Sequence, residues 1–296
     1  MSSRGKTAIC IGNFDGLHKG HRKLLDEFQK RARSENLKPI LITFRPHPFL
    51  FFNPQKRYLL SDYSKKIELI RSVYPSIEIN ITEFDKKLQS MSAKEYCEQI
   101  LMDKEPALVC VGYDLQIGHD KKYARDIIPS EIPDCEVLEI SPVKDGDKII
   151  SSSLIRECLA SGEVSDVREY LMRDFSMIGI VGTGKKLGRT IGFPTLNIEI
   201  HKNIVSPRFG VYGVEIVLND EKFYGIMNIG KNPTVSDDEQ IKVEVHVLDF
   251  NRDVYGEEVE VRFKSFVRDE KKFDSLDLLK QQILKDVNTV KEYFEI

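Results

Sequence analysis

The stretch GNFDGLHKGH at residues 12–21 decides the fold of the first half of the chain. The apolar run 8–11 precedes it, and apolar residues at helical spacing follow it over 21–33. A strand, a glycine-rich turn and a helix start in this order bind anions, because the first N–H groups of a helix are unpaired and carry partial positive charge. Glycines let the backbone of the turn approach a ligand closely. The stretch therefore predicts a phosphate site in nucleotide chemistry.

Two histidines in this stretch are the main candidates for contact with phosphate. His18 and His21 are three residues apart, so both face one polyphosphate from the first turn of the helix. A lone His-x-Gly-His is more often an ordinary surface loop, so the prediction depends on the preceding strand and the following helix. The other residues of the turn expected to bind ATP phosphates are Gly12, Phe14, Asp15, Gly16 and Gly20.

Short apolar runs alternate with amphipathic stretches over the first 170 or so residues. This alternation predicts an α/β fold with a doubly wound parallel sheet, in which ligands bind at the carboxyl ends of the strands. The expected strands are 8–12, 39–44, 77–81, 107–112 and 136–140. The expected helices are 21–33, 64–73, 92–102, 152–160 and 163–172.

The sequence changes in character after Asp174. Short β-rich runs with turn residues between them predict a small antiparallel barrel, and an apolar stripe near the end predicts a helix that packs on it. The expected strands are 176–182, 210–218, 222–229, 241–250 and 257–263. We therefore expect two domains, 1–174 and 175–296.

Composition narrows the class of protein. With 41% hydrophobic and 31% charged residues, the chain is typical of a soluble globular protein. A net charge of −3 argues against nucleic acid or membrane as a partner. No apolar run is long enough for a membrane span, and the N-terminus lacks the apolar core of a signal peptide. Five cysteines without a CxxC pair predict reduced, structural thiols and a cytoplasmic protein. The oligomeric state stays open.

Two further features of the first half are expected near the same edge of the sheet. Ser152 and Ser153 precede a helical pattern, and Arg156 lies one turn in, where it suits bidentate contacts to phosphate oxygens. Taken alone, this segment is more simply a helix cap with a solvated arginine. The segments TFRPHP (43–48) and VGYDLQIG (111–118) each follow an expected strand, so they rim the same pocket.

The second half carries a glycine-rich cationic segment, GTGKKLGRTIGFPTLN, at residues 182–197. Its spacing is not that of a P-loop, but its glycines and cations suit a polyphosphate. The expected phosphate contacts are Gly182, Gly184, Lys185, Gly188 and Arg189. Thr195 and Asn197 are two residues apart, so in an extended segment they offer two oxygen ligands on one side for Mg²⁺ held with ATP.

A carboxylate on an expected strand is the candidate general base. In EVHVLDF, Glu244, His246 and Leu248 alternate with Val245 and Val247, so Glu244 faces one side of the strand. A carboxylate that faces a barrel pocket suits removal of a proton from a hydroxyl nucleophile. An ordinary half-buried strand with a paired glutamate explains the same pattern equally well.

The core His18-Lys19-Gly20-His21 resembles the signature of nucleotidyltransferases that transfer AMP from ATP. Both halves together resemble the bacterial bifunctional riboflavin kinase/FAD synthetase family from about Ala8 to the end of the chain. In the first half the resemblance rests on GNFDGLHKGH, TFRPHP, VGYD and SSSLIR. In the second half it rests on GKKLGRTIGFPTLNI, GVYGV, NIGKNPT, EVHVLDF, DVYG and VRDEKKFDSLDLLKQQI.

This resemblance implies two reactions and a role for each motif. The first domain joins FMN to AMP from ATP and releases pyrophosphate; the second moves the γ-phosphoryl group of ATP to riboflavin. The implied catalytic residues are Glu244, His18, His21 and Arg156, with Ser152 and Ser153 completing the phosphate site. Thr195 and Asn197 hold Mg²⁺ in this scheme, and the flavin contacts are Phe44, His47, Asp114 and Arg268.

The chain departs from the family at the third motif. The family has two aromatic residues where this sequence has Leu115 and Ile117, which predicts weaker stacking on an isoalloxazine ring there. A monofunctional riboflavin kinase with a drifted first half is therefore an alternative. A flavin-binding regulator without turnover is another, but it predicts loss of Thr195, Asn197 or Glu244, and all three are present. The acceptor of the first domain is not identified by the His-x-Gly-His chemistry alone.

Overall fold

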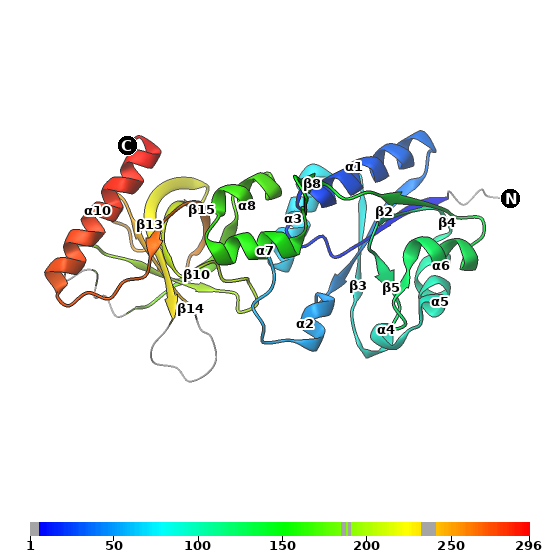
Figure 1. Cartoon of the computed structure of the whole chain (residues 1–296), viewed down its shortest axis with the longest axis horizontal. Helices are drawn as coiled ribbons and strands as arrows, with labels where there is room; N and C mark the ends of the chain where they lie inside the picture. The colour runs from blue at the N-terminus through cyan, green and yellow to red at the C-terminus, as the bar shows by residue number, and fades with distance from the viewer. Residues whose placement is uncertain (1–5, 185–187, 189–190, 232–240) are drawn as a thin grey trace. The chain divides into compact units, whose positions relative to one another are not determined.

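The computed structural model describes residues 6–184, 188, 191–231 and 241–296 (Figure 1). By their contacts the residues form two compact units: the first is Met1–Lys56 with Tyr63–Ser152, and the second is Arg57–Asp62 with Ser153–Ile296. The contacts thus divide the chain after Ser152, whereas the sequence changes character after Asp174. The residues between these two points pack with the barrel.

The first unit is built on one parallel sheet, as predicted. Its strands are β1 (Thr7–Ile11), β2 (Lys38–Arg45), β3 (Glu78–Glu83), β4 (Pro106–Gly112) and β7 (Glu136–Ile140). They lie in the order β3-β2-β1-β4-β7, and every pair is parallel. Since β1 lies at the centre, with the chain crossing from one side of it to the other, the turn after β1 lies at the switch point where ligands bind in such sheets.

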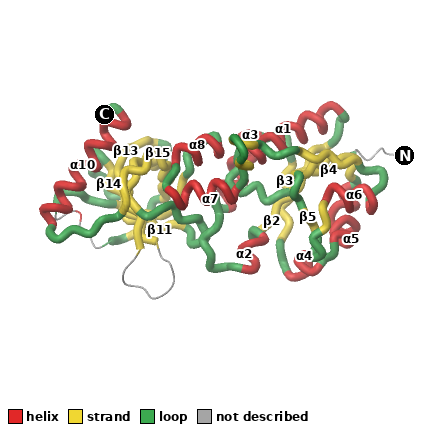
Figure 2. Tube along the Cα trace, in the orientation of Figure 1, coloured by secondary structure: helices red, strands yellow, loops and turns green. Residues whose placement is uncertain are grey.

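Helices cover both faces of this sheet (Figure 2). On one face α1 (Lys19–Ser34) and α3 (Tyr63–Val73) pack on the strands through Leu25, Phe28 and Ile70. On the other face lie α4 (Lys86–Ser90), α5 (Ala93–Tyr96) and α6 (Ala124–Glu131). The expected helix 92–102 is α5 followed by a π turn, Cys97–Leu101, and a 3-10 turn, Met102–Lys104. The patterns did not predict α4, α6 or α2 (Pro48–Phe52).

Two short hairpins complete the first unit. They are β5 (Gln116–Ile117) with β6 (Lys122–Tyr123), and β8 (Lys144–Asp145) with β9 (Lys148–Ile149). All five cysteines of the chain are buried free thiols. Across the described residues, no helix has the length and apolarity that a membrane crossing requires.

The second unit is a closed antiparallel barrel, which confirms the second predicted fold. Its strands are β10 (Ser176–Gly182), β11 (Leu196–Ile200), β12 (Gly210–Leu218), β13 (Glu221–Lys231), β14 (Ile241–Val247) and β15 (Glu258–Asp269), in the order β10-β11-β14-β13-β12-β15. Of these strands, only β11 was absent from the expected ones: its LNIEI sequence alternates, but it is five residues long and directly follows the glycine-rich segment.

Three helices pack on the barrel. The last, α10 (Leu276–Phe294), lays Val287 and Val290 on β12 and β13, as its apolar stripe predicted. The other two are α7 (Ser152–Ser161), whose first residue belongs to the first unit, and α8 (Val164–Leu171), which packs on β15.

Candidate active sites

The turn between β1 and α1 has a constrained backbone. Phe14 and Leu17 adopt φ values of 51° and 44°, which are costly for residues with a side chain, and Gly16 adopts φ 81°. The side chains of Phe14 and Leu17 are fully buried in the core that α1 and α3 form with the sheet. The core therefore holds Phe14 and Leu17 in place, and the turn between them keeps one conformation. Phe14 contributes to the predicted phosphate site through its backbone, since its ring is buried.

His18 and His21 lie together at the start of α1. His18 is the N-cap residue, and its Nδ1 accepts a hydrogen bond from His21 N at 3.3 Å. The two rings stack with centroids 3.7 Å apart. Burial of the ring, together with the nearby His18 and Lys66, lowers the pKa of His21 well below its usual 6.5. His21 is thus neutral at neutral pH, so it offers an imidazole N–H to an anion and no net charge.

The segment before α7 packs against this turn inside the first unit. Ser152 Oγ donates to Asp15 O at 3.0 Å, across 137 residues of sequence. Ile150 O lies so close to Gly20 that a Cβ there would approach it to 3.2 Å. The structure therefore brings Ser152 to the turn with the predicted residues Asp15 and Gly20.

Ser153 and Arg156 fall in the other compact unit. There Arg156 Nε donates to Tyr58 O at 2.7 Å, and the guanidinium lies 3.6 Å above the Tyr58 ring. The roles of Ser153 and Arg156 at the ATP phosphates stay predictions.

Aromatic side chains gather after the carboxyl end of β2. Phe44 meets Phe84 edge to face at 6.0 Å, and Phe84 in turn contacts Phe51 and Phe52. Phe52 is 61% exposed, so it offers a ring face to a ligand. His47 caps α2, its Nδ1 accepting from Phe49 N at 3.1 Å.

The third motif follows β4. Asp114 is exposed there. Ile117, by contrast, is buried in the core between the sheet and α5, and Leu115 packs against the same core. The expectation that these two residues weaken stacking on a flavin is therefore not supported by the structure. Their apolar side chains pack in or against the core, whereas Asp114 and Gln116 are exposed.

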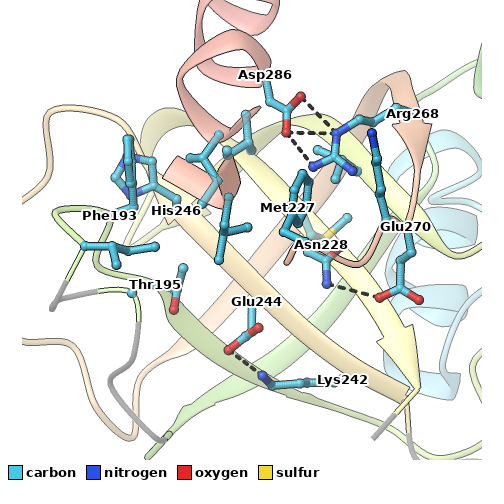
Figure 3. A pocket seen from close by; sticks show the side chains of 18 residues that line it. Phe193, Thr195, Met227, Asn228, Lys242, Glu244, His246, Arg268, Glu270 and Asp286 are labelled. Atoms are coloured by element: carbon cyan, nitrogen blue, oxygen red, sulfur yellow. Dashed lines mark hydrogen bonds and ion pairs between the residues drawn. The ribbon is translucent and has the colours of Figure 1, made fainter. Parts of the chain in front are cut away.

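The barrel unit contains a pocket of about 290 Å³ between the strands and α10 (Figure 3). Apolar residues line one part of it and charged residues the other. The lining residues are Gly188, Ile191, Phe193, Thr195, Val211, Ile226, Met227, Asn228, Lys242, Glu244, His246, Arg268, Glu270, Lys271, Phe273, Leu279, Ile283 and Asp286. Four predicted site residues thus line one cavity: Gly188, Thr195, Glu244 and Arg268.

Glu244 projects from β14 into this pocket. Its neighbours Val243 and Val245 are buried on the opposite face, so the strand alternates as the sequence predicted. Lys242 Nζ lies 2.8 Å from Glu244 Oε1 (Figure 3). Glu244 is paired in register with Asn197 on β11 and with Asn228 on β13. Directly opposite residues carry their side chains on the same face, so the predicted base lies beside a predicted magnesium ligand.

Arg268 is held by α10. Its guanidinium donates to both carboxylate oxygens of Asp286 at 2.7–3.1 Å, and Asp286 is 2% exposed. Gln282, one turn earlier, donates to the same carboxylate at 2.9 Å. This bidentate pair joins β15 to α10 across one wall of the pocket (Figure 3).

A second pocket of about 370 Å³ in the same unit also reaches Thr195. It is lined by Val181, Pro194, Thr195, Leu196, Val247, Phe250, Asn251, Arg252, Asp253, Val254 and Tyr255. Among the described residues, Thr195 alone lines both pockets.

The glycine-rich segment lies next to this residue. Gly184 packs directly against the Asn197 amide, where a Cβ would collide with it. Gly182 ends β10, and Gly188 lines the first pocket. The predicted phosphate contacts Lys185 and Arg189 lie outside the described residues.

Comparison with known proteins agrees with this two-site arrangement. The sequence profile of the FAD synthetase family matches residues 1–154, and that of the riboflavin kinase family matches residues 171–294. A bifunctional riboflavin kinase/FMN adenylyltransferase of Buchnera aphidicola is 37% identical over 98% of this chain and 95% of its own. The enzyme of that description from Escherichia coli K12 is 32% identical over 97% of this chain and 92% of its own.

The chain belongs to the bifunctional riboflavin kinase/FMN adenylyltransferase family. It is an enzyme of flavin cofactor synthesis with both activities, and a monofunctional kinase is not favoured because both profiles match. A crystal structure described as a macrolide-efflux protein from Streptococcus pneumoniae superimposes with a TM-score of 0.87 at 29% identity, covering 98% of this chain and 95% of that one.

Sequence reasoning missed several residues of these bifunctional-enzyme sites. The first pocket of the barrel unit is also lined by Asn228, Lys242 and Asp286. Of these three, only Asp286 carried a signal in the sequence, as a carboxylate on the apolar stripe of α10. Lys66 was missed beside the β1–α1 turn. A lysine on the buried face of a helix, next to Ile67 and Ile70, was the signal that could have identified it.

Proposed function

We propose a residue-level assignment of the two reactions. In the barrel unit, riboflavin binds in the pocket that holds Glu244, and ATP binds in the second pocket. The observation that carries this assignment is the sharing of Thr195 by the two pockets, since a phosphoryl group transferred between two ligands must lie where their sites meet.

Glu244 is the general base in this scheme. Its carboxylate takes the proton of the riboflavin 5′-hydroxyl as that oxygen attacks the γ-phosphorus, and the bond from phosphorus to the bridging oxygen of ADP breaks. Lys242 holds the carboxylate at 2.8 Å and fixes its orientation. The apolar wall of Phe193, Ile226 and Ile283 suits the flavin ring. Arg268, fixed by Asp286, borders the same space.

Thr195 and Asn197 would hold Mg²⁺. A hydroxyl and an amide oxygen are the hard ligands that this ion takes beside phosphate oxygens, and Asn197 is fixed against Gly184 of the glycine-rich segment. When bound, the ion neutralises charge on the ATP phosphates.

The β1–α1 turn is the adenylyltransferase site in our assignment. A phosphate oxygen of FMN attacks the α-phosphorus of ATP, and pyrophosphate leaves. The nucleophile is already an anion, so no protein base is needed and the site stabilises charge. His18, His21 and the N–H groups of the turn would bind the phosphates. Phe44, Phe52, His47 and Asp114 follow the neighbouring strands and would face the flavin.

The scheme also assigns domains, substrates and location. Residues 1–174 serve FMN adenylylation and residues 175–296 serve riboflavin phosphorylation, in line with the two matched profiles. The substrates are ATP, riboflavin and FMN. A net charge of −3 and five buried thiols support a cytoplasmic enzyme that binds neither nucleic acid nor membrane.

A single substitution separates the two reactions. Glu244→Gln keeps the shape of the side chain and removes the base, so FMN formation from riboflavin should fall by about 10²–10⁴-fold. FAD formation from supplied FMN should stay at the wild-type rate, because Glu244 lies in the other unit. Chromatography of riboflavin, FMN and FAD measures both rates in one sample. Undiminished FMN formation would exclude Glu244 as the base.

A further inference from the structure

A buried lysine lies beside the β1–α1 turn. Lys66, on α3, is 7% exposed, and its ammonium donates to Asn13 O at 3.2 Å and to Thr43 Oγ at 3.0 Å. Thr43 donates to the same Asn13 carbonyl at 3.2 Å. No carboxylate of the described residues lies within ion-pair distance of Lys66. A lysine buried without such a partner costs stability.

The groups that face Lys66 come from three elements. Asp15 on the turn and His21 on α1 are close enough to interact electrostatically with it. Its Nζ lies 5.3 Å from the ring centre of Tyr63, and the guanidinium of Arg45 on β2 lies 4.6 Å from the same ring centre. Burial lowers the pKa of Lys66 to about 8, although Asp15 acts in the opposite direction. Lys66 therefore loses its proton near pH 8.

The hydrogen bonds of Lys66 fix a peptide plane in the turn. In a trans peptide the C=O and N–H groups point in opposite directions, so anchoring the Asn13 carbonyl on Lys66 turns the Phe14 N–H away from the lysine. Phe14 is also the first of the two residues with costly positive φ. Nearby, Asn13 Oδ1 and His21 Nδ1 are buried and have no hydrogen-bond partner in the described part of the chain. Unsatisfied buried polar atoms of this kind indicate a polar ligand.

We propose that Lys66 is a positioning residue for adenylyl transfer: its ammonium holds the Asn13 carbonyl, and with it the phosphate-binding turn, in the reactive geometry and adds positive charge to the site. The inference rests on the assignment of FMN adenylylation to this turn. Lys66 acts through the turn, so its removal should lower kcat for FAD formation more than it raises KM for ATP.

The first test removes the positive charge of Lys66 and nearly keeps the length of its side chain. Lys66→Met should lower kcat for FAD formation from FMN and ATP by about 10²-fold, the typical cost of a misplaced reacting group. Riboflavin kinase activity of the same chain should be unchanged. Lys66→Arg, which keeps a cation, should retain FAD formation to within about tenfold. The control is Lys30→Met on α1, whose side chain is 76% exposed and which should behave like wild type.

The second test follows the charge of Lys66 through the pH dependence of the reaction and uses only the wild type and Lys66→Arg, which keeps the cation. FAD formation by the wild type should decline as the pH rises above about 8, since Lys66 then loses its proton. Lys66→Arg should move this decline to higher pH, because a guanidinium stays protonated. Kinase activity, measured in parallel, corrects for effects on ATP and magnesium.

The possible outcomes distinguish an error in the assignment of the turn from an error in the role of Lys66. Absence of FAD formation by the wild type would overturn the assignment of the turn to FMN adenylylation. Wild-type FAD formation by Lys66→Met, or an alkaline decline that Lys66→Arg leaves in place, would overturn the role of Lys66 alone. Should Lys66→Met fail to fold, the pH profiles of the wild type and Lys66→Arg still decide.

Discussion

The two proposed reaction sites of this enzyme are built in different ways. The β1–α1 turn uses backbone N–H groups, a neutral imidazole and one buried lysine, all held by a constrained turn. The barrel pocket uses charged side chains paired between elements, Glu244 with Lys242 and Arg268 with Asp286. The first site is thus shaped mainly by backbone conformation, and the second by contacts between side chains.

This difference follows the chemistry of the two nucleophiles. FMN brings a phosphate that is already ionised, so its site needs donors for developing charge. Riboflavin brings a hydroxyl, which must lose a proton, so its site needs a carboxylate held in a defined orientation. ATP is therefore a substrate at both proposed sites, although the two sites differ in their chemistry.

The largest expected effect tests the neutral imidazole. His21→Phe keeps a ring that can stack on His18 and removes the N–H donor, so FAD formation should fall by about 10²–10³-fold, the typical cost of losing one donor to developing charge. Riboflavin kinase activity should be unchanged. Steady-state rates of both reactions at saturating ATP measure this. Retention of FAD formation would show that the backbone N–H groups suffice without His21.

A smaller effect tests the ion pair of the barrel unit. Asp286→Ala leaves the Arg268 guanidinium without its carboxylate partner, and the barrel unit should lose about 3 kcal/mol of stability, the lower end of the range for a broken buried pair because Arg268 is partly exposed. Urea unfolding followed by circular dichroism measures the loss. Glu292→Ala, an exposed change on the same helix, should cost less than about 0.5 kcal/mol. Equal stability of the two variants would contradict a structural role for the pair.

The smallest effect is a pH dependence of stability from His21. Its pKa is lowered in the folded state, so between that value and 6.5 the unfolded chain binds a proton that the folded chain does not. The stabilising contribution is complete above pH 6.5 and declines as the pH falls below it, by at most about 1.4 kcal/mol per pH unit. Urea unfolding of wild type and His21→Phe between about pH 7.5 and 5.5 isolates this contribution. Parallel pH profiles for the two proteins would show that His21 titrates normally.

Sequence patterns predicted most strands of both units, the turn at residues 12–21 and the alternation of β14. They missed β11, a five-residue strand that directly follows the glycine-rich segment, and the short helices α2, α4 and α6. They also led to the expectation that Leu115 and Ile117 weaken stacking on a flavin, which the structure does not support. Ile117 is buried and Leu115 packs against the same core, a distinction that depends on how β5 folds back onto the sheet.

By itself the sequence determined the elements that depend on local spacing: a strand, a glycine-rich turn and a helix in one stretch, and a strand with Glu244 on one face. Only the tertiary structure decided which side chains meet. Lys66 reaches Asn13 across 53 residues, Ser152 reaches Asp15 across 137, and Thr195 comes to line two pockets at once. Periodicity reports which face of an element is apolar, whereas these contacts depend on the order of strands in the sheet and on the closure of the barrel.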